Sequence, residues 1–152
     1  MGDGLRGAVL DLARIQGMLQ SEPRGKTAFG PWVHRLFSYL MCDHNSVITT
    51  DLVLQQIRKC AETVKPDKEG WRTMCLYFTG HGDTEGNWCF PDGTITLQDV
   101  VDQIPIFDKF FSLRIFTDCC YSGNWCNLVK ERKVYAKGKV YVTCYAACAH
   151  DE

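Results

Sequence analysis

The chain has 152 residues, of which 9 are cysteines, and 17 Lys and Arg stand against 18 Asp and Glu. This length predicts one domain over residues 1–152, and the 45% hydrophobic and 23% charged shares exclude a disordered chain. The net charge of −1 gives no electrostatic reason to expect nucleic acid or an anionic membrane as a partner.

The first half of the chain has helical periodicity. Residues 5–20 place apolar side chains at helical spacing and predict an amphipathic helix. A second helix is expected over residues 31–41, where a proline can occupy the first turn. A third is expected to begin near Thr50 or Asp51, either of which can act as its N-cap, and to end before Pro66.

The second half consists of short apolar runs that are typical of buried strands. These runs are residues 72–79 (RTMCLYFT), 112–118 (SLRIFTD) and 139–146 (KVYVTCYA). Between the first two, residues 96–104 predict a helix in which Thr96 and Asp99 form a capping box. Strands that alternate with helices predict an α/β fold with a mostly parallel sheet flanked by helices.

The cysteine count and the first residues of the sequence indicate the cellular compartment that we expect for the protein. An odd cysteine count excludes complete disulfide pairing within one chain. The opening, MGDGLRGAVLDLARIQG, carries charges where a signal peptide has its apolar core, and no window reaches the roughly 18 apolar residues of a membrane helix. We expect a reducing, cytoplasmic location in which thiols stay free.

Two motifs that can carry chemistry follow predicted strands. Residues 80–82, GHG, follow the first strand, and Cys119 and Cys120 follow the second. Carboxyl ends of parallel neighbouring strands meet at one sheet edge, so we expect the His81 imidazole and a thiol to emerge together. The imidazole can take the thiol proton so that the thiolate attacks an acyl carbon, and the Gly82 amide can approach an oxyanion.

At these residues the chain resembles the caspase-like cysteine peptidases, and the metacaspase and paracaspase branch in particular. That family carries an aromatic-Ser-Gly-His-Gly segment after one strand and Asp-Ser-Cys-His-Ser-Gly after the next. Here residues 78–82 read FTGHG and residues 118–123 read DCCYSG. Residues 7–13, GAVLDLA, and residues 145–148, YAAC, extend the match. The resemblance implies the three-layer sandwich of the caspase-hemoglobinase fold.

The resemblance also implies a role for each matching residue. His81 would be the general base and Cys120 the nucleophile, while Cys119 stands where the family commonly has Ser. The amides of Gly82 and Cys120 would form the oxyanion hole. The family generally works as a Cys-His dyad, so we expect no cofactor.

Charge at the specificity position predicts the substrate. Caspases that hold a substrate aspartate have Gln two residues before the nucleophile, whereas this chain has Asp118, and a carboxylate favours a basic side chain. In metacaspases the equivalent Asp, an Asp of the first helix and the Ser before Gly-His line the pocket. The matching positions here are Asp118, Asp11 and Thr79. We expect a cysteine endopeptidase that cleaves protein or peptide substrates after Arg or Lys.

The chain also departs from the family. Many metacaspases bind calcium through an acidic cluster, but the corresponding residues 90–101 offer only Asp92 and Asp99, so we expect no metal. The family sheet has six strands, and the first and the last have no counterpart among the predicted elements. We expect that a second copy or another chain completes the sheet, that the chain is a truncated or rearranged product, or that activity is lost.

Two other functions remain open. One is a zinc-binding module, for which Cys119, Cys120 and Cys126 form one cluster and Cys144, Cys148 and His150 another. The other is a catalytically inactive caspase-like protein that regulates a full-length peptidase or assembles through open sheet edges. For Trp88 and Trp125, which closely follow the two motifs, we expect a position in the core or in the wall of the pocket, and their spacing favours the pocket wall.

Overall fold

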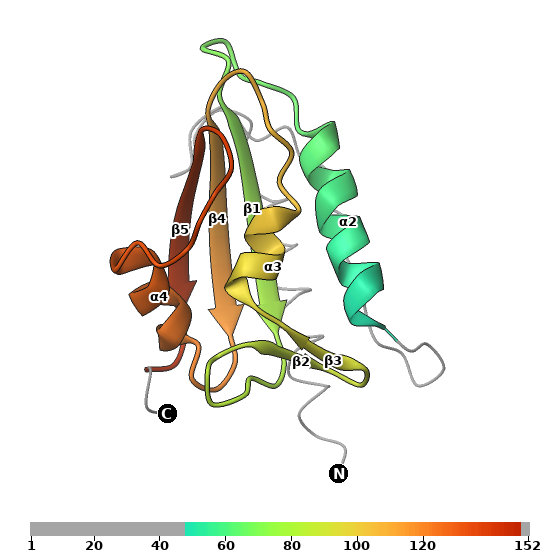
Figure 1. Ribbon diagram of the computed structural model, residues 1–152, viewed down its shortest axis with the longest axis vertical. Coiled ribbons are helices and arrows are strands. Elements are labelled where there is room, and N and C mark those ends of the chain that lie inside the picture. Colours follow the sequence, from blue (N-terminus) through green and yellow to red (C-terminus); the bar gives the residue numbers. More distant parts are fainter. Residues whose placement is uncertain (1–47, 150–152) are drawn as a thin grey trace, which may run out of the picture. The chain divides into compact units, whose positions relative to one another are not determined.

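The computed structural model describes residues 48–149. Asp11 and the helices predicted over residues 5–20 and 31–41 lie outside the described residues. A three-stranded sheet forms the centre of the described part (Figure 1). Its strands are β1 (Arg72–Thr79), β4 (Phe111–Asp118) and β5 (Val140–Ala146), in the order β1-β4-β5. Both pairings are parallel, which confirms the predicted α/β architecture with a mostly parallel sheet flanked by helices.

The register of the sheet brings the two motifs to one edge. Thr79 at the end of β1 is the partner of Asp118 at the end of β4. The segments that carry His81 and Cys120 therefore leave the sheet side by side, as the sequence predicts.

Two helices begin at threonine caps. Helix α2 (Thr50–Thr63) is capped by Thr49, whose hydroxyl accepts from the Leu52 amide at 3.3 Å, so the predicted cap at Thr50 or Asp51 is wrong. The Thr50 amide instead donates to the Asp92 carboxylate at 3.0 Å and 3.1 Å. Helix α3 (Leu97–Asp102) has the predicted capping box and ends before residue 104.

Three short elements of the described part were not predicted from the sequence. Strands β2 (Trp88–Phe90) and β3 (Gly93–Ile95) form an antiparallel hairpin, and helix α4 is Gly123–Lys130. The hairpin follows the histidine motif and α4 follows the cysteine motif, so both elements bear on the geometry of the site.

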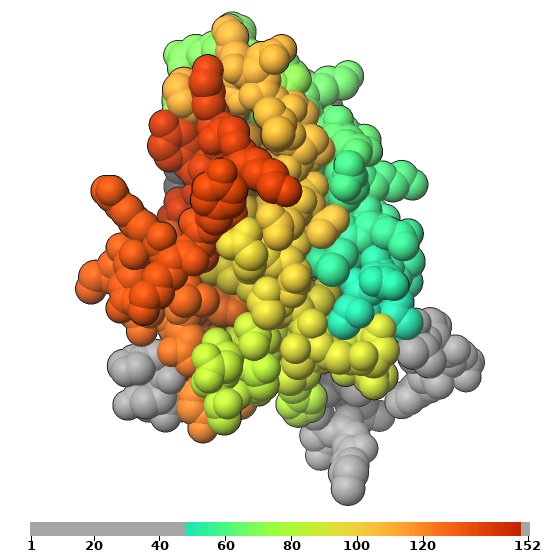
Figure 2. Space-filling model, in the orientation of Figure 1, coloured from blue at the N-terminus to red at the C-terminus, as the bar shows by residue number. Residues whose placement is uncertain are grey.

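The core lies on one face of the sheet. Along β4 the side chains of Phe111, Leu113, Ile115 and Thr117 are all buried, and they alternate with half-buried residues on the other face. Side chains of α2, α3 and α4 join this core, and Figure 2 shows the side chains of α2 and α3 packed over this face. None of the helices in residues 48–149 has the length and apolar character that a bilayer crossing requires.

Candidate active site

The histidine loop, residues 80–82, follows β1 in the chain and is hydrogen-bonded to the end of β4 and to β2. The Gly80 amide donates to the Asp118 carbonyl at 3.2 Å, and the Cys89 amide donates to the His81 carbonyl at 2.9 Å. Gly82 forms an antiparallel bridge with Trp88. These bonds fix the backbone on both sides of an exposed His81 side chain.

Gly82 lies directly against the cysteine loop, residues 119–122. A Cβ at position 82 would collide with the Cys120 carbonyl oxygen and would come within 2.9 Å of the Cys119 sulfur. Only glycine permits so close an approach of two backbone segments. The GHG motif and the DCC motif are therefore in contact through their backbones, as the shared sheet edge predicts.

Burial distinguishes the two adjacent cysteines. Cys119 is 4% exposed, and its sulfur lies 3.4 Å from the Thr117 hydroxyl and 4.0 Å from the Gly86 carbonyl oxygen. Burial is the main cause that raises the pKa of the Cys119 thiol. Cys120 is exposed. A thiol must be reachable and must ionise to act as a nucleophile, which favours Cys120 over Cys119.

A strained turn follows Cys120. Tyr121 adopts a φ of 55°, a left-handed conformation that costs a residue with a side chain about 1 kcal/mol or more. Hydrogen bonds hold this turn, because the Ser122 amide donates to the Cys119 carbonyl at 3.3 Å and the Asn124 amide donates to the Tyr121 carbonyl at 3.0 Å. The chain passes in this way from β4 through Cys120 directly into α4.

The loop of residues 83–87, DTEGN, packs against this turn, and sequence reasoning did not assign it a role. The Asp83 carboxylate accepts from the amides of Glu85 and Asn87, both at 2.9 Å. The Asn124 side chain donates to the Thr84 carbonyl at 3.1 Å. A side chain at Gly86, where φ is 77°, would collide with the Tyr121 carbonyl oxygen. The spacing Asp-x-x-Gly is a turn signal that was available in the sequence.

Asp118 and Thr79, both predicted to bind substrate, face each other across the β1–β4 pair. The Tyr77 hydroxyl donates to the Asp118 carboxylate at 3.4 Å, a contact that sequence reasoning did not foresee. Both Thr79 and Asp118 are half-buried. Asp11, the third residue of the predicted pocket, lies outside the described residues.

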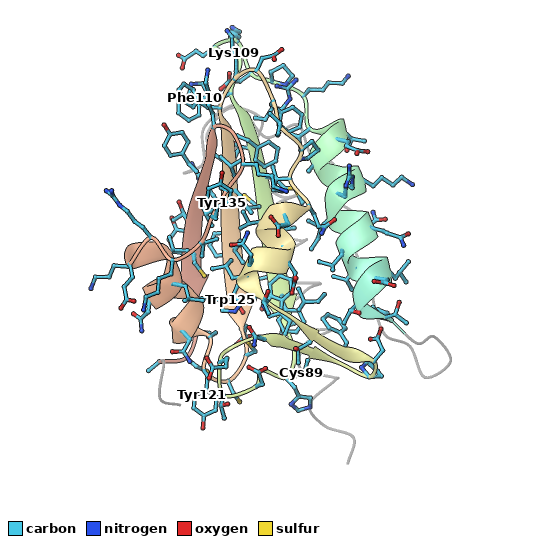
Figure 3. All side chains as sticks on the ribbon, in the orientation of Figure 1. Cys89, Lys109, Phe110, Tyr121, Trp125 and Tyr135 are labelled. Atoms are coloured by element: carbon cyan, nitrogen blue, oxygen red, sulfur yellow. The ribbon has the colours of Figure 1, made fainter. Side chains whose placement is uncertain are left out.

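Trp88 and Trp125 belong to the buried core, which is the less favoured of their two expected positions. Trp88 is 3% exposed and Trp125 is fully buried, and their rings stack at 4.7 Å between centroids. The Trp88 indole donates to the Thr117 hydroxyl at 2.9 Å. Figure 3 shows Trp125 inside the molecule, whereas Tyr121 and Cys89 lie at the end where the strands finish.

No three His, Cys, Asp or Glu residues within 48–149 are arranged to hold a metal ion. His150, which the zinc alternative requires, lies outside the described residues. The two acids of the segment compared with a calcium site serve other contacts: Asp92 binds Thr50, and Asp99 completes the capping box of α3.

The imidazole and the thiol are both accessible, since His81 and Cys120 are exposed. Among the described residues, no hydrogen bond joins the His81 ring to the Cys120 sulfur. Catalytic hydrogen bonds in ligand-free enzymes are often long and tighten only when substrate binds.

Comparison of the chain with protein-family models, with curated proteins and with solved structures found no match. The described part of the chain is an α/β structure in which one edge of a parallel sheet carries an accessible imidazole, an accessible thiol and a half-buried carboxylate.

Proposed function

We propose that the chain is a cysteine endopeptidase of caspase-like fold that cleaves after Arg or Lys with a His81–Cys120 dyad. The observation that carries this proposal is the backbone contact of Gly82 with Cys120, which brings an accessible imidazole and an accessible thiol to one sheet edge. The buried Cys119 beside them supports Cys120 as the nucleophile.

In the proposed reaction, His81 takes the proton of the Cys120 thiol and the sulfur attacks the carbonyl carbon of the substrate. The amides of Gly82 and Cys120 donate to the oxyanion that forms. His81 then returns the proton to the leaving amine as the C–N bond breaks. Water hydrolyses the resulting thioester, which frees the acid product and the Cys120 thiol.

The preference for a basic side chain rests on Asp118. Its carboxylate stands at the end of β4, two residues before the proposed nucleophile, and can accept from a guanidinium or ammonium group. The Tyr77 hydroxyl and the neighbouring Thr79 add polar groups next to it. An aspartyl substrate would meet a like charge at this position, which disfavours its binding.

A second candidate is a caspase-like interaction protein without activity. The observation that favours it is the edge position of β5, because within residues 48–149 this strand pairs with β4 alone. A second copy or another chain could add a strand to such an edge. Both candidates agree with the expected cytoplasmic location.

Hydrolysis of fluorogenic peptides separates the two candidates. We expect purified protein to hydrolyse peptides that end in Arg or Lys and to leave peptides that end in Asp uncut. Cys120→Ala should abolish the hydrolysis, whereas Cys119→Ser, the matched control at the neighbouring thiol, should retain it. Absence of hydrolysis by well-folded wild-type protein, with or without an added partner, would favour the interaction protein.

A further inference from the structure

Cys126 and Cys144 are in direct contact although 18 positions separate them. Cys126 belongs to α4 and Cys144 to β5, and the Cys126 thiol donates to the Cys144 carbonyl oxygen at 3.4 Å. Both side chains are half-buried, and all eight cysteines within residues 48–149 are free. Neither residue has a role in the proposed peptidase reaction.

The position of Cys144 in the sheet explains this contact. The Ala147 amide donates to the Thr117 carbonyl at 3.1 Å, so position 147 turns its backbone groups toward β4. Backbone groups alternate in direction along a strand, and Cys144 therefore turns its carbonyl to the outer edge of β5. Figure 1 shows α4 beside the C-terminal part of this edge, where the Cys126 thiol donates to the single carbonyl of Cys144.

The ionisation of the Cys144 thiol reflects its surroundings. Burial is the main cause that raises the pKa of the Cys144 thiol, and the neighbouring Cys126, through its charge and a hydrogen bond between the thiols, raises it further. The contact itself is geometric, because the Cys126 sulfur lies 3.4 Å from the Cys144 carbonyl oxygen. Because Cys144 ionises with difficulty, we assign the first attack on an oxidant to Cys126.

We infer that Cys126 and Cys144 are a redox modification site, at which a peroxide forms a reversible disulfide that fastens α4 to β5. The Cys126 thiolate attacks one oxygen of hydrogen peroxide, the O–O bond breaks, and sulfenic acid and, after protonation, water result. The Cys144 sulfur then attacks the Cys126 sulfur, the S–O bond breaks, and the departing hydroxide takes the Cys144 thiol proton and leaves as a second water. Two thiols are oxidised by two electrons and one peroxide is reduced.

The disulfide would restrict the motion of the segment that follows the proposed nucleophile. Helix α4 begins three positions after Cys120, and β5 leads to Cys148, whose amide donates to the buried Ser122 hydroxyl at 3.2 Å. Cross-linking α4 to β5 closes the intervening loop covalently and restricts the unfolded chain. The inference holds whether or not the chain is a peptidase.

A competing pair lies nearby. The Cys119 and Cys148 thiols also interact through charge, so these two residues could form a different bridge between the same segments. The Cys119 sulfur, however, is buried beside the Thr117 hydroxyl and the Gly86 carbonyl. A peroxide reaches such a sulfur less readily than the half-buried Cys126.

Peptide mapping of the full chain after treatment with hydrogen peroxide tests the inference. Trypsin leaves Cys119, Cys120 and Cys126 on one peptide. Chymotrypsin cuts after Tyr121, which separates Cys126 from Cys119 and Cys120, and after Tyr145, which separates Cys144 from Cys148. We expect a linked peptide pair that contains Cys126 and Cys144 and that dithiothreitol releases. Linkage of Cys119 to Cys148 alone, or no intramolecular disulfide, would overturn the inference.

Two variants test the assignment of the disulfide to Cys126 by thermal unfolding, a measurement separate from peptide mapping. Cys126→Ser should lose the rise in thermal midpoint that peroxide gives the wild-type chain. Cys75→Ser, the matched control at an exposed thiol on β1, should keep that rise. If Cys126→Ser does not fold, the wild-type mapping alone decides. An equal rise in both variants would contradict the assignment.

Discussion

The Gly82 α-carbon lies so close to the Cys120 carbonyl oxygen that a Cβ at position 82 would collide with it. The same Cβ would lie 2.9 Å from the Cys119 sulfur. The first collision involves backbone, which cannot give way as a flexible side chain can. The histidine loop and the cysteine loop therefore pack backbone against backbone at this point, with no room for a side chain at position 82.

Gly82→Ala should damage both the fold and the proposed site. We expect the free energy of unfolding to fall by about 1–3 kcal/mol, as in other overpacked positions, and peptidase activity to fall more than about tenfold. Gly80→Ala is the matched control, because a Cβ there meets only the Phe78 ring, at 2.9 Å. Urea unfolding and the peptide assay measure both effects. Equal stability and activity in wild type and Gly82→Ala would show that the loops are not in contact.

Asp118→Asn should weaken selection of basic substrates. Loss of a charge-assisted hydrogen bond costs about 1.5–3 kcal/mol, so kcat/KM for arginyl peptides should fall about tenfold or more. Tyr77→Phe removes the 3.4 Å bond to Asp118 but keeps the carboxylate, and should lower the same constant only a few-fold. Unchanged kcat/KM in Asp118→Asn would remove Asp118 from the proposed pocket.

Much of this sheet could be predicted because each of its strands coincides with a short apolar run in the sequence. Residues 72–79 are a continuous run of strand formers, and β1 has those bounds. The hairpin β2–β3 gives no such signal, because each strand has three residues and its position depends on pairing with the histidine loop. The cap of α2 was misassigned by one or two residues, because Thr49, Thr50 and Asp51 are all suitable caps and the sequence does not show that the Thr49 hydroxyl accepts from the Leu52 amide.

The site was predictable in part for the same reason. The rule that parallel strands end at one edge placed the His81 and Cys120 segments together from sequence alone. This rule does not distinguish Cys119 from Cys120 as the nucleophile. The difference lies in the burial of the Cys119 sulfur against Gly82 and Gly86, which belong to another segment of the chain. The contact of Cys126 with Cys144 depends on the packing of α4 against β5, which no spacing indicates.

Thr117→Val should destabilise the core below the site. The Trp88 indole would lose its acceptor at 2.9 Å while remaining buried, and a buried unsatisfied donor costs about 1–3 kcal/mol. Thr143→Val is the matched control on the exposed face of β5 and should change stability by less than about 0.5 kcal/mol. Denaturant unfolding of both variants tests the difference. Equal effects at the two positions would contradict a specific role for the Trp88 bond.

Stability should fall in alkaline solution. Burial raises the pKa of the Cys119 and Cys144 thiols above the ordinary value of 9.0, so the folded chain keeps protons that the unfolded chain loses. This contribution is complete below pH 9 and is lost as the pH rises further. Urea unfolding in a phosphine reductant should show the decline, and Cys144→Ala should make it shallower. A constant free energy of unfolding from pH 8 to pH 10 would contradict the prediction.

Labelling by an arginyl fluoromethyl ketone tests the proposed dyad most directly. A nucleophilic sulfur displaces fluoride and forms a stable thioether, and mass spectrometry then locates the modified residue. We predict one label, on Cys120, that is lost in Cys120→Ala and retained in Cys119→Ser. A label on Cys119, or a folded wild-type chain that takes up no label, would contradict the proposal.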